Sequence, residues 1–317
     1  MGLAAIATER SRTIRLELRV DLRLTLGPLC RGRADPAMRF EAGKGAGAVL
    51  RATRSPQGPV ATRISVAPGD GTVSMQAWGP GSAWALDAFP ALVGADDDAS
   101  GFDVALDPVV AYLFRRLPGL RIGRSQSVVE ALVPTVLEQK VVGKQARRSY
   151  AGMVRALGES APGPVALDLV VPPASPVWAA APLWLFHRHG VERKRADAVR
   201  VACSYAARLE ETVGLPPVEA RRRLTALPGI GAWTAAEVTR LALGDADAVS
   251  VGDYHLPNQV AWALAGEPRA DDARMLALLE PWRGHRARVT RLIEAGGPQP
   301  PRYGPRMPLR DLSSQVQ

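Results

Sequence analysis

The N-terminal part of the chain alternates apolar and polar positions in the way that is typical of β-strands. From Ile14 to Leu26 every second residue is apolar, which predicts a strand with one face on the core and one in water. Shorter runs bounded by turn residues predict strands at 49–54, 60–66 and 72–78. Residues 84–93 have a helical pattern. We therefore predict a small antiparallel-sheet α+β domain over residues 13–104, preceded by a disordered segment at 1–12.

From residue 107 onward the spacing of apolar residues becomes helical. Asp107-Pro108 is a typical helix start, because an N-cap residue is followed by proline in the first turn. Helices are predicted at 108–116, 126–157, 177–188, 194–212, 217–226, 232–243, 254–265, 271–280 and 284–295, with a break in the second. The predicted fold class is thus α+β: the sheet domain, an all-helical domain at 105–296, and an irregular Pro/Arg-rich tail at 297–317.

The charge balance indicates a polyanionic partner. The 317 residues include 40 Lys and Arg against 31 Asp and Glu, a net charge of +9. Such a surface attracts nucleic acid, although basic residues scattered over a solvated surface would give the same total.

The composition disfavours several function classes. No apolar run in the sequence approaches the roughly 18–20 residues that span a bilayer, and the first residues do not resemble a secretory signal. We therefore expect a cytoplasmic protein with no membrane partner. Cys30 and Cys203 are too few for a disulfide framework or a four-cysteine iron–sulfur cluster. The four histidines are not spaced as a ligand set, so no metal site is predicted.

The most informative stretch is Leu-Pro-Gly-Ile-Gly at residues 227–231, between two helical patterns. Pro228 ends the first helix, and Gly229 and Gly231 let the backbone adopt positive φ angles. Successive backbone N–H groups at the start of the second helix would then point outward and bind a phosphate without regard to base sequence. An ordinary helix–turn–helix corner would need the same glycines for packing, so the motif alone leaves both interpretations open.

A carboxylate occupies a second informative position. Asp253 follows Gly252 and directly precedes the next helical pattern. An aspartate there can cap a helix. It can also stabilise a cationic sugar during N-glycosidic cleavage and orient or deprotonate the incoming water.

The combination of the hairpin, Trp233 and Asp253 resembles the helix-hairpin-helix-GPD superfamily of base-excision DNA glycosylases, and within it most the DNA-3-methyladenine glycosylase II family. The resemblance extends to residues 133–148 and 280–286 and covers about 105–295. It implies a monomeric, monofunctional glycosylase that hydrolyses the N-glycosidic bond of alkylated, 3-methyladenine-like purines in damaged double-stranded DNA. No organic cofactor is implied, but a monovalent cation at the hairpin is compatible with the family when DNA is bound.

The resemblance also implies roles for individual residues. Asp253 matches the catalytic aspartate. Trp233 stands where bifunctional relatives carry a nucleophilic lysine, so no lyase activity is expected, and its ring would stack on a cationic base unless it merely packs in the core. The expected base-binding residues are Trp233, Glu237, Gln139 and Tyr254. The expected DNA contacts are Leu227, Pro228, Gly229, Ile230, Gly231, Lys140, Lys144 and Arg147.

Three positions depart from the family pattern. Lys140 stands where many relatives have an apolar wedge that fills the space of the flipped base. Glu237 and Arg291 replace aromatic residues, and Glu237 could pair with a cationic base, with Arg240 or with Arg291. Two alternatives therefore stay open: a non-catalytic helix-hairpin-helix DNA-binding protein, and a glycosylase for mismatched adenine or uracil.

Overall fold

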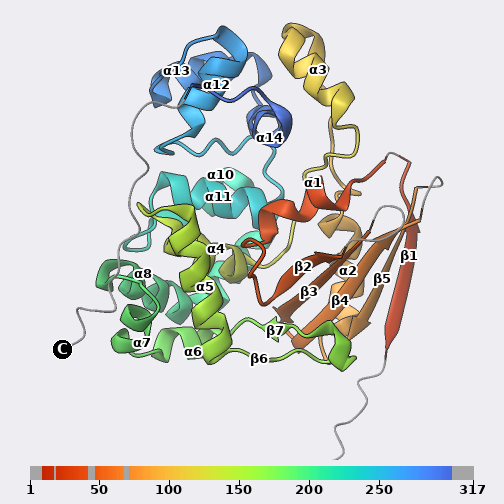
Figure 1. The fold of residues 1–317 in the computed structure, drawn as a ribbon, viewed down its shortest axis with the longest axis vertical. Coiled ribbons are helices and arrows are strands. Elements are labelled where there is room, and N and C mark those ends of the chain that lie inside the picture. Colours follow the sequence, from red (N-terminus) through yellow and green to blue (C-terminus); the bar gives the residue numbers. More distant parts are fainter. Residues whose placement is uncertain (1–8, 18, 42–46, 68–70, 302–317) are drawn as a thin grey trace, which may run out of the picture.

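The computed structural model describes residues 9–17, 19–41, 47–67 and 71–301 (Figure 1). Its N-terminal part is a five-stranded antiparallel sheet in the order β1-β5-β4-β3-β2. The strands are β1 (Arg10–Arg15), β2 (Met38–Glu41), β3 (Ala48–Ser55), β4 (Gly58–Val66) and β5 (Thr72–Trp78). Helix α2 (Ser82–Leu92) packs on the sheet and buries Phe89 completely. The strands predicted at 49–54, 60–66 and 72–78 are confirmed as β3, β4 and β5.

The long strand predicted from Ile14 to Leu26 is wrong beyond Arg15. A short helix, α1 (Leu22–Leu26), follows instead and continues into a 3₁₀ turn, η1 (Gly27–Leu29). The carboxylate of Asp21 caps α1 by accepting the N–H groups of Arg23 at 2.8 Å and Leu24 at 3.0 Å. Leu22 and Leu26, one helical turn apart, are both buried on the same face. Because apolar residues four apart satisfy both periods, the alternation here did not distinguish strand from helix.

Two further differences concern the ends of the sheet domain. Arg10, Ser11 and Arg12 lie in β1, so the prediction of disorder is wrong for these three residues, and residues 1–8 lie outside the described residues. Strand β2 was not predicted at all. At the other end of the chain, residues 302–317 of the predicted tail also lie outside the described residues.

Between residues 79 and 301 the described chain is mainly helical, and it contains two short paired strands, β6 (Glu159–Ser160) and β7 (Val170–Val171). The helices are α3 (Pro108–Arg116), α4 (Val128–Glu138), α5 (Gly143–Leu157), α6 (Ser175–Ala180), α7 (Leu183–Arg188), α8 (Arg193–Ser204), α9 (Ala206–Glu210), α10 (Pro217–Thr225), α11 (Ala232–Leu243), α12 (Leu256–Ala265), α13 (Asp272–Leu279) and α14 (Arg286–Gly296). The predicted break in 126–157 is confirmed between α4 and α5. The ranges 177–188 and 194–212 each divide into two helices.

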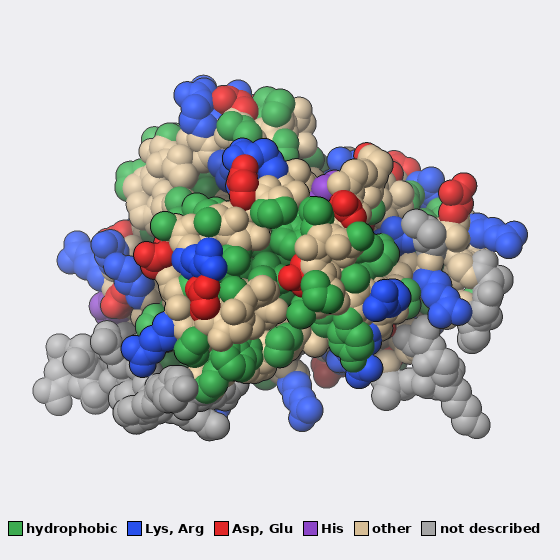
Figure 2. Space-filling view, turned by 90° about the horizontal axis from the view of Figure 1, so that it is seen from above, with side chains coloured by type: hydrophobic (Ala, Val, Ile, Leu, Met, Phe, Trp, Pro, Cys, Tyr) green, Lys and Arg blue, Asp and Glu red, His purple; other side chains and the backbone are tan. Residues whose placement is uncertain are grey.

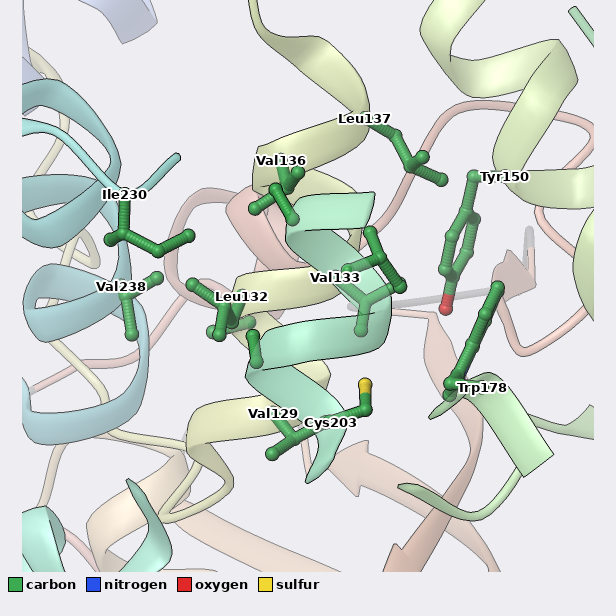
Figure 3. Close-up of a cluster of buried hydrophobic side chains, with 14 of the residues drawn as sticks. Val129, Leu132, Val133, Val136, Leu137, Tyr150, Trp178, Cys203, Ile230 and Val238 are labelled. Carbon is green, nitrogen blue, oxygen red and sulfur yellow. The ribbon is translucent and has the colours of Figure 1, made fainter. Parts of the chain in front are cut away.

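Helix α4 is the centre of the helical part. All of its residues except Glu130 and Glu138 are buried, which explains why the segment is apolar on every side. Figure 3 shows its side chains between Ile230 and Val238 on one side and Tyr150 and Trp178 on the other. Helix α4 therefore fixes the hairpin and α11 relative to α5. A separate core joins α3, α12, α13 and α14, which lie together at the top of Figure 1.

Candidate active site and nucleic-acid interface

The predicted hairpin connects α10 to α11, and its first glycine is required by the backbone. Gly229 has a φ of +84°, and a Cβ atom there would lie 2.8 Å from the Cβ of Ala198 in α8. Gly231 has a φ of −95°, which any residue adopts. The expected positive φ is therefore correct for Gly229 and wrong for Gly231.

The N-terminus of α11 is open to an anion. Gly231 is the N-cap residue, and among the described residues no side chain caps the helix at this end. Gly231 and Ala232 are exposed, so the unpaired N–H groups and the helix dipole face solvent. Pro228 is also exposed and Leu227 is half-buried. Ile230 is only 4% exposed because its side chain anchors the hairpin in the core, so only its backbone is available for DNA.

Asp253 is half-buried and is held by three N–H donors. Its Oδ1 accepts the backbone N–H groups of His255 at 2.7 Å and Leu256 at 2.8 Å, which makes it a cap for α12. Its Oδ2 accepts the indole N–H of Trp233 at 3.0 Å. The carboxylate thus has a fixed orientation between α11 and α12. Because each carboxylate oxygen has two lone pairs, the group can still accept a proton or a bond from a water molecule.

Glu237 lies one turn after Trp233 and already has partners within the protein. It forms an ion pair with Arg240 and accepts a hydrogen bond from Ser250. The side chains of Glu237 and Arg240 are 17% and 11% exposed. Burial by itself would raise the pKa of Glu237, but the positive charge of Arg240 and the two hydrogen bonds outweigh it and lower the pKa. Of the partners that the sequence allowed for Glu237, the structure shows Arg240.

Replacing Glu237 by Gln should lower the stability of the fold in a pH-dependent way. The folded-state pKa lies below the ordinary value of 4.5, so the ionised group stabilises the fold above that pH, and this contribution is lost as the pH falls through the folded pKa. Leaving Arg240 without its partner costs about 3 kcal/mol at neutral pH. Urea unfolding of both proteins at pH 7 and at pH 4 should show a smaller difference at pH 4. An equal difference at both pH values would contradict the assignment.

Gln139 and Lys140 form the start of the loop between α4 and α5. The amide of Gln139 donates to the carbonyl of Gly229 at 3.0 Å and to the hydroxyl of Thr234 at 2.9 Å. Its side chain is therefore engaged with the hairpin rather than directed to a base. Lys140 is exposed and has a φ of +55°, which is unusual for a residue with a side chain. Lys144 and Arg147 are exposed on α5.

Tyr254 and Arg291 have different surroundings. Tyr254 is 82% exposed and packs edge-on against the ring of His255. Arg291 pairs with Glu294 and donates to the carbonyl of Leu24 at 3.2 Å. A shallow cavity between the sheet domain and the helical domain is lined by Thr25, Leu26, Pro28, Leu29, Leu92, Arg121, Ile122, Gly123, Arg240, Leu241 and Arg291. Asp253 does not line this cavity.

The structure therefore brings together Asp253, Trp233 and Glu237 on one side and joins Gln139 to the hairpin on the other. Two participants had not been singled out as site residues: Ser250, which donates to Glu237, and Arg31, whose positive charge also helps to lower the pKa of Glu237. Ser250 stands three residues before Asp253, so its proximity was a usable signal. Arg31 belongs to the sheet domain and carries no local signal.

The positive charge is not concentrated in one place on the face that Figure 2 shows. Seen from above in Figure 2, Lys and Arg side chains stand both at the edge and within the face, several of them beside acidic groups, with apolar side chains near its centre. On this face the net charge does not gather into one patch. This face therefore offers no broad basic patch for DNA.

The described residues lack two kinds of feature. No helix there is long and apolar enough to cross a membrane. The same residues contain no group of three or more His, Cys, Asp or Glu side chains that could hold a metal ion.

Comparison with known proteins gives sequence relatives and structural neighbours but no matching family model. A probable bifunctional transcriptional activator/DNA repair enzyme AlkA from Mycobacterium tuberculosis is 30% identical over 198 residues, which is 60% of this chain and 38% of that protein. The chain thus corresponds to well under half the length of that relative.

Two solved structures share the fold over nearly the whole chain. A 3-methyladenine DNA glycosylase from Archaeoglobus fulgidus superposes with a TM-score of 0.75 at 20% identity, covering 89% of this chain and 97% of that one. An 8-oxoguanine glycosylase/lyase from Clostridium acetobutylicum in complex with double-stranded DNA gives 0.68 at 12% identity, covering 90% and 95%. The sequence match and the common fold confirm the resemblance that the hairpin, Trp233 and Asp253 indicated.

Proposed function

We propose that this chain, which belongs to the helix-hairpin-helix-GPD superfamily, is a monofunctional DNA glycosylase of base excision repair. Its substrates would be alkylated, 3-methyladenine-like purines in double-stranded DNA. The observation that carries the proposal is the fixed carboxylate of Asp253, which lies between α11 and α12 next to a hairpin suited to phosphate. The names of the AlkA relative and the archaeal neighbour favour alkylated purines over other lesions.

The mechanism needs a target base that has left the helical stack. Flipping costs a few kcal/mol, and less for a damaged or mispaired base. The hairpin would hold the phosphate backbone while the sugar lies against Asp253. The carboxylate would then stabilise the cationic sugar as the bond to the base breaks and would orient the attacking water.

The chain has no amine at the position where a lyase would carry its nucleophilic lysine. That position is Trp233, whose indole N–H is donated to Asp253. Water would attack the sugar instead, leaving an abasic site and an uncut strand. Borohydride should therefore trap no covalent complex.

A monovalent cation at the hairpin is part of the proposal for the DNA-bound state. The carbonyl oxygens of Leu227 and Gly229 each accept one hydrogen bond, from Ile230 and Gln139. Each oxygen keeps a second lone pair, which suits a hard cation.

Base release from duplexes that carry one modified base each tests the proposal. We expect release of alkylated purines by the purified monomer and none from undamaged DNA. Release only from adenine-mismatch or uracil duplexes would make mismatched adenine or uracil, and not alkylated purines, the substrate. If the protein binds DNA but releases no base from any duplex, it is a non-catalytic helix-hairpin-helix DNA-binding protein. The capping role of Asp253 favours that alternative.

The contribution of α5 to DNA binding should be visible in the salt dependence. Replacing Lys144 by Ala should reduce the slope of log Kd against log salt concentration by about one, because roughly one phosphate contact is lost. Arg63 of β4, whose side chain is 43% exposed, provides the matched control. Fluorescence anisotropy between low and moderate salt measures both variants. An unchanged slope for Lys144→Ala, or an equal change for Arg63→Ala, would remove α5 from the interface.

A further inference from the structure

The segment after η1 carries an arginine of the sheet domain into the helical domain. Arg31 is 9% exposed, and its Nη1 atom lies 3.5 and 3.4 Å from the two carboxylate oxygens of Glu138, the last residue of α4. The backbone around Arg31 is fixed by Asp35, whose carboxylate accepts the N–H groups of Arg31 at 2.6 Å and Ala37 at 2.9 Å. The guanidinium therefore reaches α4 from a rigid turn.

The same segment is fitted against α5. Gly32 has a φ of +92°, and a Cβ atom there would lie 2.8 Å from Cδ of Arg147. Arg155 donates from Nη2 to the carbonyl of Ala34 at 2.9 Å. Arg31 is thus placed by contacts with both helices that flank the α4–α5 loop.

That loop begins at the residue after Glu138. Its first residue, Gln139, is tied to the hairpin, and its second, Lys140, is exposed in a left-handed backbone conformation. This conformation costs a residue with a side chain about 1 kcal/mol, so neighbouring contacts must impose it. The pair between Arg31 and Glu138 holds the end of α4 just before this residue, and the hydrogen bonds of the Gln139 amide hold its immediate neighbour.

Domain docking does not by itself explain a buried arginine at this place. A second ion pair, between Arg51 of β3 and Glu130 at the start of α4, already joins the two domains at 2.7 Å. Thr53 also bonds to Glu130. The Nε atom of Arg31, by contrast, is buried without a hydrogen-bond partner in the described part of the chain, which costs stability.

We propose that Arg31 is a positioning residue: through Glu138 it holds the α4–α5 loop so that Lys140 enters the space left by the flipped base. The proposal rests on the proposed function and gives the sheet domain a part in it. Loss of Arg31 should leave the hairpin and its phosphate contact intact but release the loop that keeps the base out of the stack.

The experiment compares Arg31→Met with Arg51→Met, since each removes a buried arginine that pairs with a glutamate of α4. Entry of the loop into DNA is read from the fluorescence of 2-aminopurine placed opposite a tetrahydrofuran abasic-site analogue, and affinity is read from anisotropy. Arg31→Met should lose most of the fluorescence change and keep its affinity within about threefold. Where base release is observed, kcat should fall about tenfold with little change in KM. Arg31→Lys should recover part of both signals, and Arg51→Met should retain them.

The outcomes separate this inference from the proposed function. If Arg31→Met and Arg51→Met lose the fluorescence change equally, both arginines serve only to dock the two domains, and the inference is overturned. No fluorescence change with the unmodified protein would also overturn it, because the loop would not enter the duplex. A normal fluorescence response without release of any base would contradict the proposed function alone. Adding Glu138→Gln to Arg31→Met should cause no further loss, since both changes break the same pair.

Discussion

Replacing Asp253 by Asn should reduce base release by about 10²–10³-fold, since the charge that faces the developing cation is removed. The amide oxygen of Asn can still accept the N–H groups of His255 and Leu256, so α12 keeps its cap. DNA affinity should therefore change little, and the fold should lose only the bond from the indole of Trp233, which costs about 1 kcal/mol. Single-turnover release from an alkylated duplex, with anisotropy for binding and urea unfolding for stability, measures the three quantities.

Asp253→Ala is the matched control because it removes the cap as well as the charge. It should be as inactive as Asp253→Asn but less stable by about 1 kcal/mol. Release by Asp253→Asn at the unmodified rate would show that the carboxylate only caps α12. The enzymatic proposal would then lose the observation that carries it.

Replacing Gly229 by Ala should damage both the fold of the hairpin and the affinity for DNA. The new Cβ would lie 2.8 Å from Ala198, in a backbone conformation with φ of +84°, so the turn must shift at a cost of about 1–3 kcal/mol. The shift would also turn the N–H groups of α11 away from the phosphate. Loss of that contact corresponds to about tenfold weaker binding, or roughly 1.4 kcal/mol.

Gly231→Ala separates the two effects of the hairpin glycines. Gly231 has an ordinary φ, and a Cβ there meets no atom within 4 Å among the described residues. The Gly231→Ala protein should therefore be as stable as the unmodified protein and should bind DNA with nearly the same affinity. If Gly229→Ala and Gly231→Ala weaken binding equally, crowding of the phosphate rather than the geometry of the turn determines the effect.

The helical part was predicted closely because its boundaries are marked by local chemistry. Asp107 caps α3 and Pro108 occupies its first turn, as predicted. The glycine turn at 227–231 separates α10 from α11 at the predicted place. Each of these signals acts within a few residues of chain, so the sequence carries it in full.

The strand predicted from Ile14 to Leu26 was wrong beyond Arg15 because two local signals conflict there. Its apolar residues alternate strictly, yet Leu22 and Leu26 also lie on one face of a helix. The capping carboxylate of Asp21 was the local signal that favours α1. Whether the alternation or the cap prevails depends on which face of the segment the rest of the protein covers.

The sequence by itself determined the helical character of residues 108–295, the glycine hairpin before α11 and the aspartate just before α12. Only the tertiary structure decided that Asp253 accepts the indole N–H of Trp233 and that Ser250 joins the local pair of Glu237 with Arg240. It also decided that Arg31 reaches Glu138 from a position 107 residues earlier. Caps and turns are contacts between near neighbours along the chain. The bonds from Trp233 to Asp253, from Ser250 to Glu237 and from Arg31 to Glu138 join distant segments, and they form only where packing of the cores brings those segments together.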